Sequence, residues 1–170
     1  GKSFVINEVC AEYENYRTTF HPDTDYASFV GSYKPITIMT NVRDMTGHPV
    51  TEDGKEIKES RIVYRYVMQA FLKAYVAAWR EQQNDEPKPI FLIVEEINRG
   101  NCAQIFGDIF QLLDRNAVGF SDYPIVADDD LAQELKGILG EFSIAKHDAI
   151  NALYSGGKDV VGMVKKGECL

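Results

Sequence analysis

The stretch FLIVEEINRGN, residues 91–101, decides the fold. Its leading apolar run, residues 90–94, has the length and continuity of a strand buried on both faces of a parallel sheet. The run passes directly into two adjacent carboxylates, Glu95 and Glu96. One interpretation is a buried strand that simply ends in water. The other is a strand that carries two acids to the sheet edge where open α/β proteins bind ligands.

The segments around this strand predict helices that alternate with strands. An apolar stripe at helical spacing predicts a helix over residues 68–84, and a second helix is expected over residues 101–115. Two β-branched runs joined by a segment with glycine and proline predict a long-looped hairpin insertion over residues 36–67. Residues 128–160 read as a helical insertion that starts at an acidic helix N-terminus. The class is therefore α/β.

Four weaker segments complete the pattern. Residues 3–16 predict an amphipathic helix with Phe4, Val5 and Val9 on its apolar stripe. A short capped helix is expected after residues 24–25, ending at Gly31. Residues 118–126 form a possible strand, and SGGKD, residues 155–159, a loop. The helical region after residue 128 is expected to break near Gly140.

Composition restricts the function classes. The chain has 170 residues, 45% of them hydrophobic and 26% charged, which fits one ordinary globular domain. A net charge of −8 argues against a broad nucleic-acid-binding face, and no apolar run approaches the roughly 20 residues of a membrane span. The three widely spaced cysteines form neither a metal pattern nor a disulfide framework, so a reducing cytoplasm is the expected setting.

The first three residues, Gly1-Lys2-Ser3, open the first predicted helix. They match the end of the phosphate-loop pattern G-x-x-x-x-G-K-[ST], in which backbone N–H groups and a helix N-terminus hold phosphates. The tripeptide alone is weak evidence. Together with the acid pair it favours a P-loop NTPase, in which the first acid assists Mg²⁺ binding and the second polarises the attacking water.

Two longer segments carry a resemblance to a known family. FHPDTDYASFVGSYKP (residues 20–35) and FLIVEEINRGNCAQIFGDIFQLLDR (residues 91–115) resemble segments of McrB-type AAA+ proteins, the NTP-driven motors of modification-dependent restriction systems. The family shows F-H-x-x-x-x-Y-x-x-F in the first segment and [DE]-E-I-N-R-[GA]-N in the second. With the first three residues, the matches cover about 45 positions in the family's order.

The resemblance implies a role for each matching residue. Gly1, Lys2 and Ser3 would bind the nucleotide, with Lys2 on the phosphates and the Ser3 hydroxyl on Mg²⁺. Glu95 would be the Mg²⁺-side acid and Glu96 the acid that activates water. Asn98 and Arg99 would complete the catalytic group near the nucleotide and a neighbouring subunit. The sequence departs from the family at Glu95, where Asp is more usual.

The resemblance also implies a fold and partners. The fold would be a three-layer P-loop AAA+ core with an incomplete parallel sheet, and residues 1–170 would begin inside the phosphate loop and end before the sensor strand. The complete protein would hydrolyse GTP or ATP with Mg²⁺ as a ring, expected to be a hexamer. An McrC-like nuclease subunit and modified DNA bound through other domains would be its partners, and the isolated fragment is expected to be inactive.

Two alternatives remain open. The first is a MoxR-like ATPase that remodels proteins, which a neighbouring nuclease or a DNA-reading domain would distinguish. The second is an AAA+ interaction domain with weakened catalysis, supported by the Glu at position 95.

Overall fold

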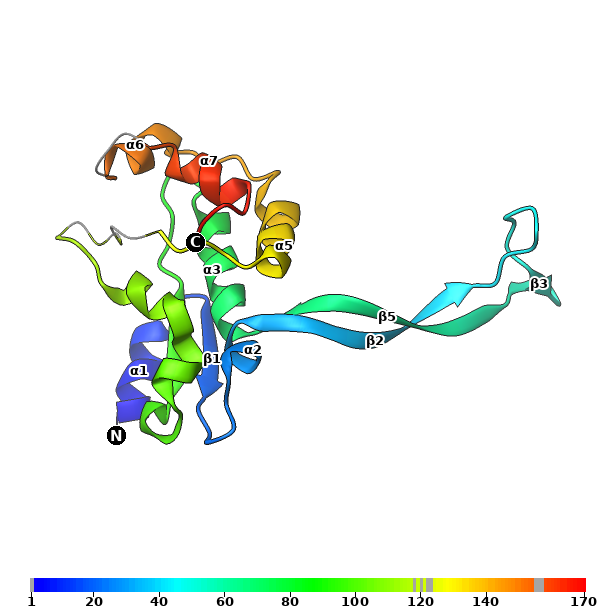
Figure 1. The fold of residues 1–170 in the computed structure, drawn as a ribbon, viewed down its shortest axis with the longest axis horizontal. Helices are drawn as coiled ribbons and strands as arrows, with labels where there is room; N and C mark the ends of the chain where they lie inside the picture. Colours follow the sequence, from blue (N-terminus) through cyan, green and yellow to red (C-terminus); the bar gives the residue numbers. More distant parts are fainter. Residues whose placement is uncertain (1, 118, 120, 122–123, 155–157) are drawn as a thin grey trace. The chain divides into compact units, whose positions relative to one another are not determined.

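The computed structural model describes residues 2–117, 119, 121, 124–154 and 158–170, with Lys2 and Ser3 as backbone only. The chain divides into two compact units (Figure 1). The packed unit comprises Gly1–Ser32 and Met68–Leu170, and the hairpin unit comprises Tyr33–Val67. None of the described helices is long and apolar enough to cross a membrane.

The sheet of the packed unit is one parallel pair of strands. Asn15–Thr19 (β1) lies beside Phe91–Glu95 (β6), with Thr19 opposite Glu95, so both strands end at the same edge. The predicted mixed α/β class with a parallel sheet is confirmed at this coarse level. The expected two-sided burial of residues 90–94 is wrong in part. Ile93 is 8% exposed, but its strand neighbours are half-buried because β6 has a single partner strand among the described residues.

Helix α3, Ala70–Glu81, confirms the helix predicted over residues 68–84. Its buried side chains are Leu72, Ala74, Val76 and Ala77. Helix α1, Lys2–Cys10, is shorter than the predicted 3–16, because a turn closed by the Tyr13 N–H and the Cys10 carbonyl (3.1 Å) follows it. Its predicted apolar stripe is exposed, at 63% for Phe4, 58% for Val5 and 57% for Val9. No described element covers these three side chains.

An aromatic cluster joins the two sequence segments that carry the family resemblance. Phe20, Phe29 and Phe106 meet edge to face, with ring centroids 5.0–5.7 Å apart. Phe20 follows β1, and Phe29 ends the short helix α2, Tyr26–Phe29, whose N-cap is Asp25, one of the two residues predicted for the cap. Both phenylalanines are fully buried. Edge-to-face pairs stabilise beyond the area they bury, so this cluster fixes the loops around the strand ends.

The helix predicted over residues 101–115 is wrong in its second half. Helix α4 covers only Cys102–Phe106, and a 3₁₀ helix, Gly107–Leu113 (η2), follows. Gly107 causes the break because its φ of +49° and ψ of −134° lie outside the helical region. Ile105 and Ile109 are buried and Leu112 is half-buried, whereas Leu113 is 56% exposed.

The C-terminal part of the packed unit is helical. Helix α5, Asp129–Leu139, and helix α6, His147–Ala152, confirm the two segments predicted to break near Gly140. A third helix, α7 (Val160–Lys165), was not predicted. The possible strand at 118–126 and the loop at 155–159 lie partly outside the described residues. Residues 119, 121 and 124–126 are described and form no strand.

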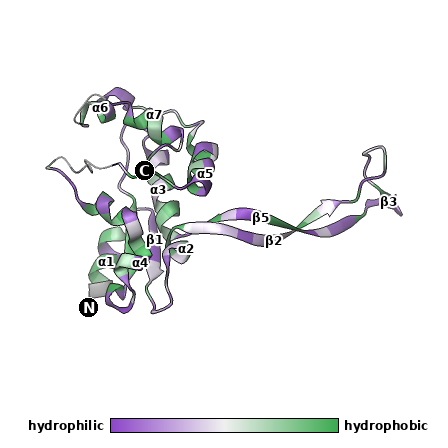
Figure 2. Ribbon diagram, in the orientation of Figure 1, coloured by the Kyte–Doolittle hydropathy of each residue, from purple (hydrophilic) through white to green (hydrophobic). Residues whose placement is uncertain are grey.

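The hairpin unit is a long two-stranded ribbon. Strand β2, Gly31–Asn41, pairs with β5, Lys58–Met68, and the short strands β3 (Thr51–Glu52) and β4 (Lys55–Glu56) flank a tight turn. Asp53 and Gly54 form that turn with φ of +51° and +75°, as expected for an Asp-Gly hairpin turn. Figure 2 shows hydrophobic and hydrophilic residues side by side along this ribbon.

Candidate functional site

The chain leaves β6 through a left-handed residue. Glu96 has φ +53° and ψ +38°, and Asp53 is the other non-glycine residue with positive φ in the described part of the chain. This conformation costs an L-residue about 1–2 kcal/mol, and such strain clusters at functional sites. Backbone hydrogen bonds hold the turn, from the Phe20 N–H to the Glu95 carbonyl (2.9 Å) and from the Arg99 N–H to the Glu96 carbonyl (2.8 Å). The direction in which Glu96 leaves the strand is thereby fixed.

Glu95 is held by side chains of the neighbouring strand. Its Oε1 accepts from Nη1 of Arg17 at 2.5 Å, and its Oε2 lies 3.5 Å from the Thr19 hydroxyl. Arg17 and Thr19 share one face of β1, because alternate residues of a strand point the same way. The side chains of Arg17 and Glu95 are about one third exposed. The carboxylate therefore sits at the rim of the sheet with one cation already beside it.

Arg17 also connects the acid to the first helix. Its Nη2 donates to Oδ1 of Asn7 at 2.5 Å, and Asn7 belongs to α1. Lys2 and Ser3 begin α1, so the helix predicted to follow a phosphate loop is linked to the acid strand through a single guanidinium. The side chains of Lys2 and Ser3 are not described, and Gly1 lies outside the described residues.

The predicted catalytic pair, Asn98 and Arg99, lies on an exposed 3₁₀ turn, Ile97–Arg99 (η1). The turn follows Glu96 directly, so the two residues stay close to the acids in sequence. Gly100 ends the turn at a place with no room for a side chain. A Cβ there would press against the Ile105 side chain and lie 3.1 Å from the Phe20 ring. The aromatic cluster thus fixes the backbone that carries the predicted residues.

The oxygen donors at this strand end are of the type that hard cations bind, and the phosphates of a bound ligand would complete the coordination shell. Among the described residues there is no group of three or more His, Cys, Asp or Glu side chains that could hold a metal ion. Mg²⁺ does not need such a group, because proteins often bind it through one or two carboxylates while phosphates and waters fill the shell. Oxygens of Glu95 and Asn7 accept from the Arg17 guanidinium, and the Thr19 hydroxyl lies 3.5 Å from the other oxygen of Glu95, so a cation already neutralises this carboxylate.

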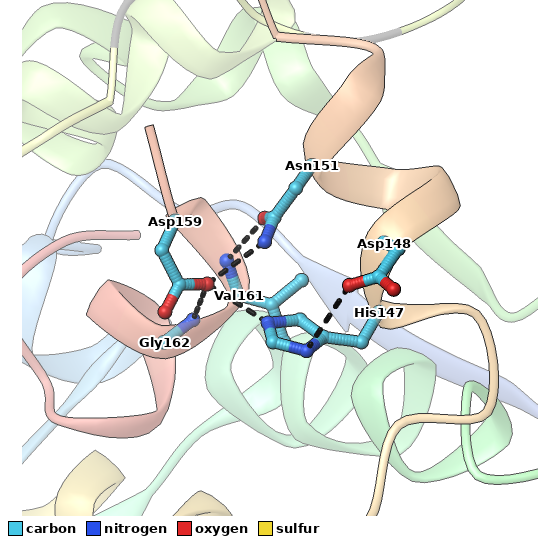
Figure 3. A network of polar contacts seen from close by, with 6 residues as sticks. All are labelled: His147, Asp148, Asn151, Asp159, Val161 and Gly162. Atoms are coloured by element: carbon cyan, nitrogen blue, oxygen red, sulfur yellow. Dashed lines mark hydrogen bonds and ion pairs between the residues drawn. The ribbon is translucent and has the colours of Figure 1, made fainter. Parts of the chain in front are cut away.

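A second polar cluster lies between α6 and α7 (Figure 3). Oδ1 of Asp159 contacts Nε2 of His147 at 2.8 Å and accepts from Nδ2 of Asn151 at 2.8 Å and from the Gly162 N–H at 2.9 Å. These contacts lower the pKa of Asp159 to about 2, with the His147 hydrogen bond as the largest cause. Oδ1 of Asn151 in turn accepts from the Val161 N–H at 3.0 Å. Because the contacts of Asp159 and Asn151 cap α7 or tie it to α6, this cluster stabilises the start of α7.

An apolar cavity of about 420 Å³ lies elsewhere in the packed unit. Its lining includes Phe71, Tyr75, Trp79, Phe106 and Ile109, and neither Glu95 nor Glu96 belongs to it. Burial raises the pKa of the Tyr75 hydroxyl, and the nearby Trp79 indole lowers that pKa by a smaller amount. The cavity is therefore separate from the acidic strand end.

Arg17 and Asn7 escaped the sequence analysis. The sequence patterns assigned no role to Arg17, and Asn7 was predicted only as part of the helix over residues 3–16. A usable signal existed in the alternation of Arg17 and Thr19, which puts both on one strand face. Deciding that this face meets Glu95 requires the register of two strands whose paired residues, such as Thr19 and Glu95, are 76 positions apart.

Comparison with known proteins supports a restriction-system relationship. No known protein family matches the chain in a search of family profiles. The Type II restriction enzyme BsuMI component YdiS of Bacillus subtilis (strain 168) is 38% identical over 140 residues. The match covers 79% of this chain, and the chain spans 38% of the length of that relative. The chain is thus similar to part of a restriction enzyme component.

Proposed function

We propose that this chain is part of an NTPase motor of McrB type that serves a restriction system. The observation that carries the proposal is the acid pair at the end of β6, where a left-handed Glu96 follows Glu95 at the rim of a parallel sheet. Carboxyl ends of parallel strands are where open α/β sheets bind ligands. The similarity to a restriction enzyme component supports the restriction context.

The proposed chemistry assigns a role to each residue. Gly1 and the backbone at the start of α1 would bind the phosphates, and Lys2 would neutralise their charge. Ser3 and Glu95 would hold Mg²⁺, which when bound offsets the charge that develops on the phosphates. Glu96 would align the attacking water and accept its proton. Asn98 and Arg99 would stabilise the transferring group or contact a neighbouring subunit.

Partners follow from the same proposal. A neighbouring subunit that supplies an arginine implies a ring, which we propose to be a hexamer. An McrC-like nuclease subunit would cut DNA that other domains of the motor recognise. GTP and ATP both remain candidate nucleotides, so both belong in every assay.

Substitution Glu96→Gln in the full-length protein tests the proposal. We expect kcat for GTP or ATP to fall about 100-fold or more, since a positioned general base contributes at least that factor, while nucleotide binding persists. Glu86→Gln is the matched control, because it makes the same chemical change on an exposed loop residue. Unchanged turnover in Glu96→Gln would refute the mechanism. Absence of turnover in the wild type with both nucleotides would favour a non-catalytic interaction domain.

A further inference from the structure

The guanidinium of Arg17 forms an ion pair with Glu95, the carboxylate that would bind Mg²⁺ in the proposed mechanism. Nη1 of Arg17 lies 2.5 Å from Oε1 of Glu95, and Nη2 lies 2.5 Å from Oδ1 of Asn7. One side chain on β1 therefore binds both the end of β6 and helix α1. The contact with Glu95 is the sole ion pair that the described part of the packed unit forms between an arginine and a carboxylate.

This ion pair is strong enough to hold Glu95 and weak enough to open. Both side chains are about one third exposed, and exposed pairs contribute little free energy because water screens them. A divalent cation that arrives with a nucleotide carries twice the charge of Arg17, so it competes well for the same oxygens. Thr19 remains within 3.5 Å of Oε2 of Glu95 and can keep the carboxylate in place during the exchange.

We propose that Arg17 is a positioning residue that occupies Glu95 in the nucleotide-free protein and must release it when Mg²⁺ binds with the nucleotide. This inference rests on the proposed NTPase function. Asn7 on α1 anchors the same guanidinium, so metal binding at the strand end and the helix that begins with Lys2 are coupled through Arg17. Arg17 thereby raises the Mg²⁺ concentration that the site requires.

The longer side chain at position 95 fits this role. Glu95 reaches one methylene further than the Asp that the family pattern usually has there, and this reach brings Oε1 to Arg17 across the strand pair. A cation that arrives with the nucleotide replaces the guanidinium at the same carboxylate, which stays beside Thr19 of β1. The alternative, that Arg17 only stabilises the fold, predicts no change in metal affinity when it is replaced.

Two substitutions separate these possibilities in the full-length protein. Arg17→Gln removes the competing cation, and Asn7→Ala removes the anchor of the guanidinium without changing charge. Arg61→Gln is the matched control, because it breaks an exposed Arg–Glu pair with Glu59 (2.7 Å) in the hairpin unit. Mg²⁺ affinity is measured by titration calorimetry with a slowly hydrolysed GTP or ATP analogue present, and thermal stability is measured without metal.

Arg17→Gln is expected to bind Mg²⁺ about 2- to 5-fold more tightly, in line with the strength of an exposed ion pair. Asn7→Ala is expected to tighten binding by a smaller factor, and Arg61→Gln to leave it unchanged. Unchanged or weaker binding in Arg17→Gln, while the wild type binds and hydrolyses nucleotide, overturns the inference and leaves the proposed function standing. If Mg²⁺ binds more tightly to Arg17→Gln but not to Asn7→Ala, Arg17 acts only as a nearby positive charge, and the inference is also overturned. A wild type that binds no Mg²⁺-nucleotide overturns both.

Discussion

The two longest strand pairs among the described residues differ in how much of their hydrophobic side chains they bury. The β1–β6 pair has only five residues in each strand, yet Phe20 next to it is fully buried and Ile93 within it nearly so. The β2–β5 pair has eleven residues in each strand, yet Ile62 and Tyr64 are about 70% exposed. Both pairs are rich in β-branched or aromatic residues. Burial therefore depends on what packs against a strand, because β-propensity mainly describes fit to a packed surface.

The difference explains why the polar site belongs to the short pair. At the end of β6, the position of Glu95 is fixed by β1, α1 and the aromatic cluster around Phe20. A two-stranded ribbon with open faces offers no comparable support, since isolated hairpins are marginally stable in water. Its own ion pair, Arg61 with Glu59, joins two residues of the same strand.

The largest expected effect is a loss of stability in the packed unit. Phe29→Ala removes a fully buried ring that contacts Phe20, Phe71 and Phe106, so we expect a loss of about 3–5 kcal/mol in the free energy of unfolding. Ile62→Ala in the hairpin unit is expected to cost less than about 1 kcal/mol. Urea unfolding followed by the fluorescence of Trp79 measures the loss in the packed unit, and the β-sheet circular dichroism signal measures the loss in the hairpin unit. Equal losses would mean that the ribbon is as well packed as the core.

The same contrast explains how far the sequence could predict the structure. Helix α3, strand β6 and the acidic N-terminus of α5 depend on local patterns, and these predictions are confirmed. The exposed stripe of α1 and the break at Gly107 depend on which surfaces meet, and local patterns do not contain that information.

The site divides in the same way. A strand that ends in two acids was predictable from residues 90–96, and the structure has β6 end at Glu95. The left-handed Glu96 and the Arg17 contact were not predictable. The first is a strained backbone conformation, and the second joins two side chains 78 positions apart and depends on the register of β1 and β6. Tertiary pairing, rather than composition, supplies what the sequence pattern lacks.

Two glycines with positive φ, one in each unit, test the comparison with effects on stability of intermediate size. Gly167 in the packed unit has φ +73°, and a Cβ there would overlap the Ala132 carbonyl oxygen. Gly54 in the hairpin turn has φ +75° with open space around it. Gly54→Ala is expected to cost about 1 kcal/mol from backbone strain alone, and Gly167→Ala about 1–3 kcal/mol more because the backbone must shift. Thermal unfolding compares the two, and a smaller loss in Gly167→Ala would show that α5 and the segment after α7 pack loosely.

Two carboxylates, one in each unit, test the comparison through the pH dependence of stability, where the smallest effect is expected. Hydrogen bonds from His147, Gly162 and Asn151 hold the pKa of Asp159 at about 2, whereas hydrogen bonds from the Thr46 hydroxyl and the His48 N–H lower the pKa of Asp44 in the hairpin unit. A lowered carboxyl pKa stabilises the fold above the ordinary value of 3.8 and loses that contribution as pH falls toward the folded value.

Carboxyl chemical shifts from NMR between pH 5 and about 1.5 measure both groups. Asp159→Asn is expected to remove the acid-dependent step in the helical circular dichroism signal, and Asp44→Asn to leave that signal unchanged, because the Asp44 contacts lie within the hairpin unit. Titration of Asp159 at or above 3.8 would contradict the contacts drawn around it. A helical signal that follows Asp44 instead would mean that the ribbon and the packed unit unfold together, and the contrast between the two strand pairs would then fail.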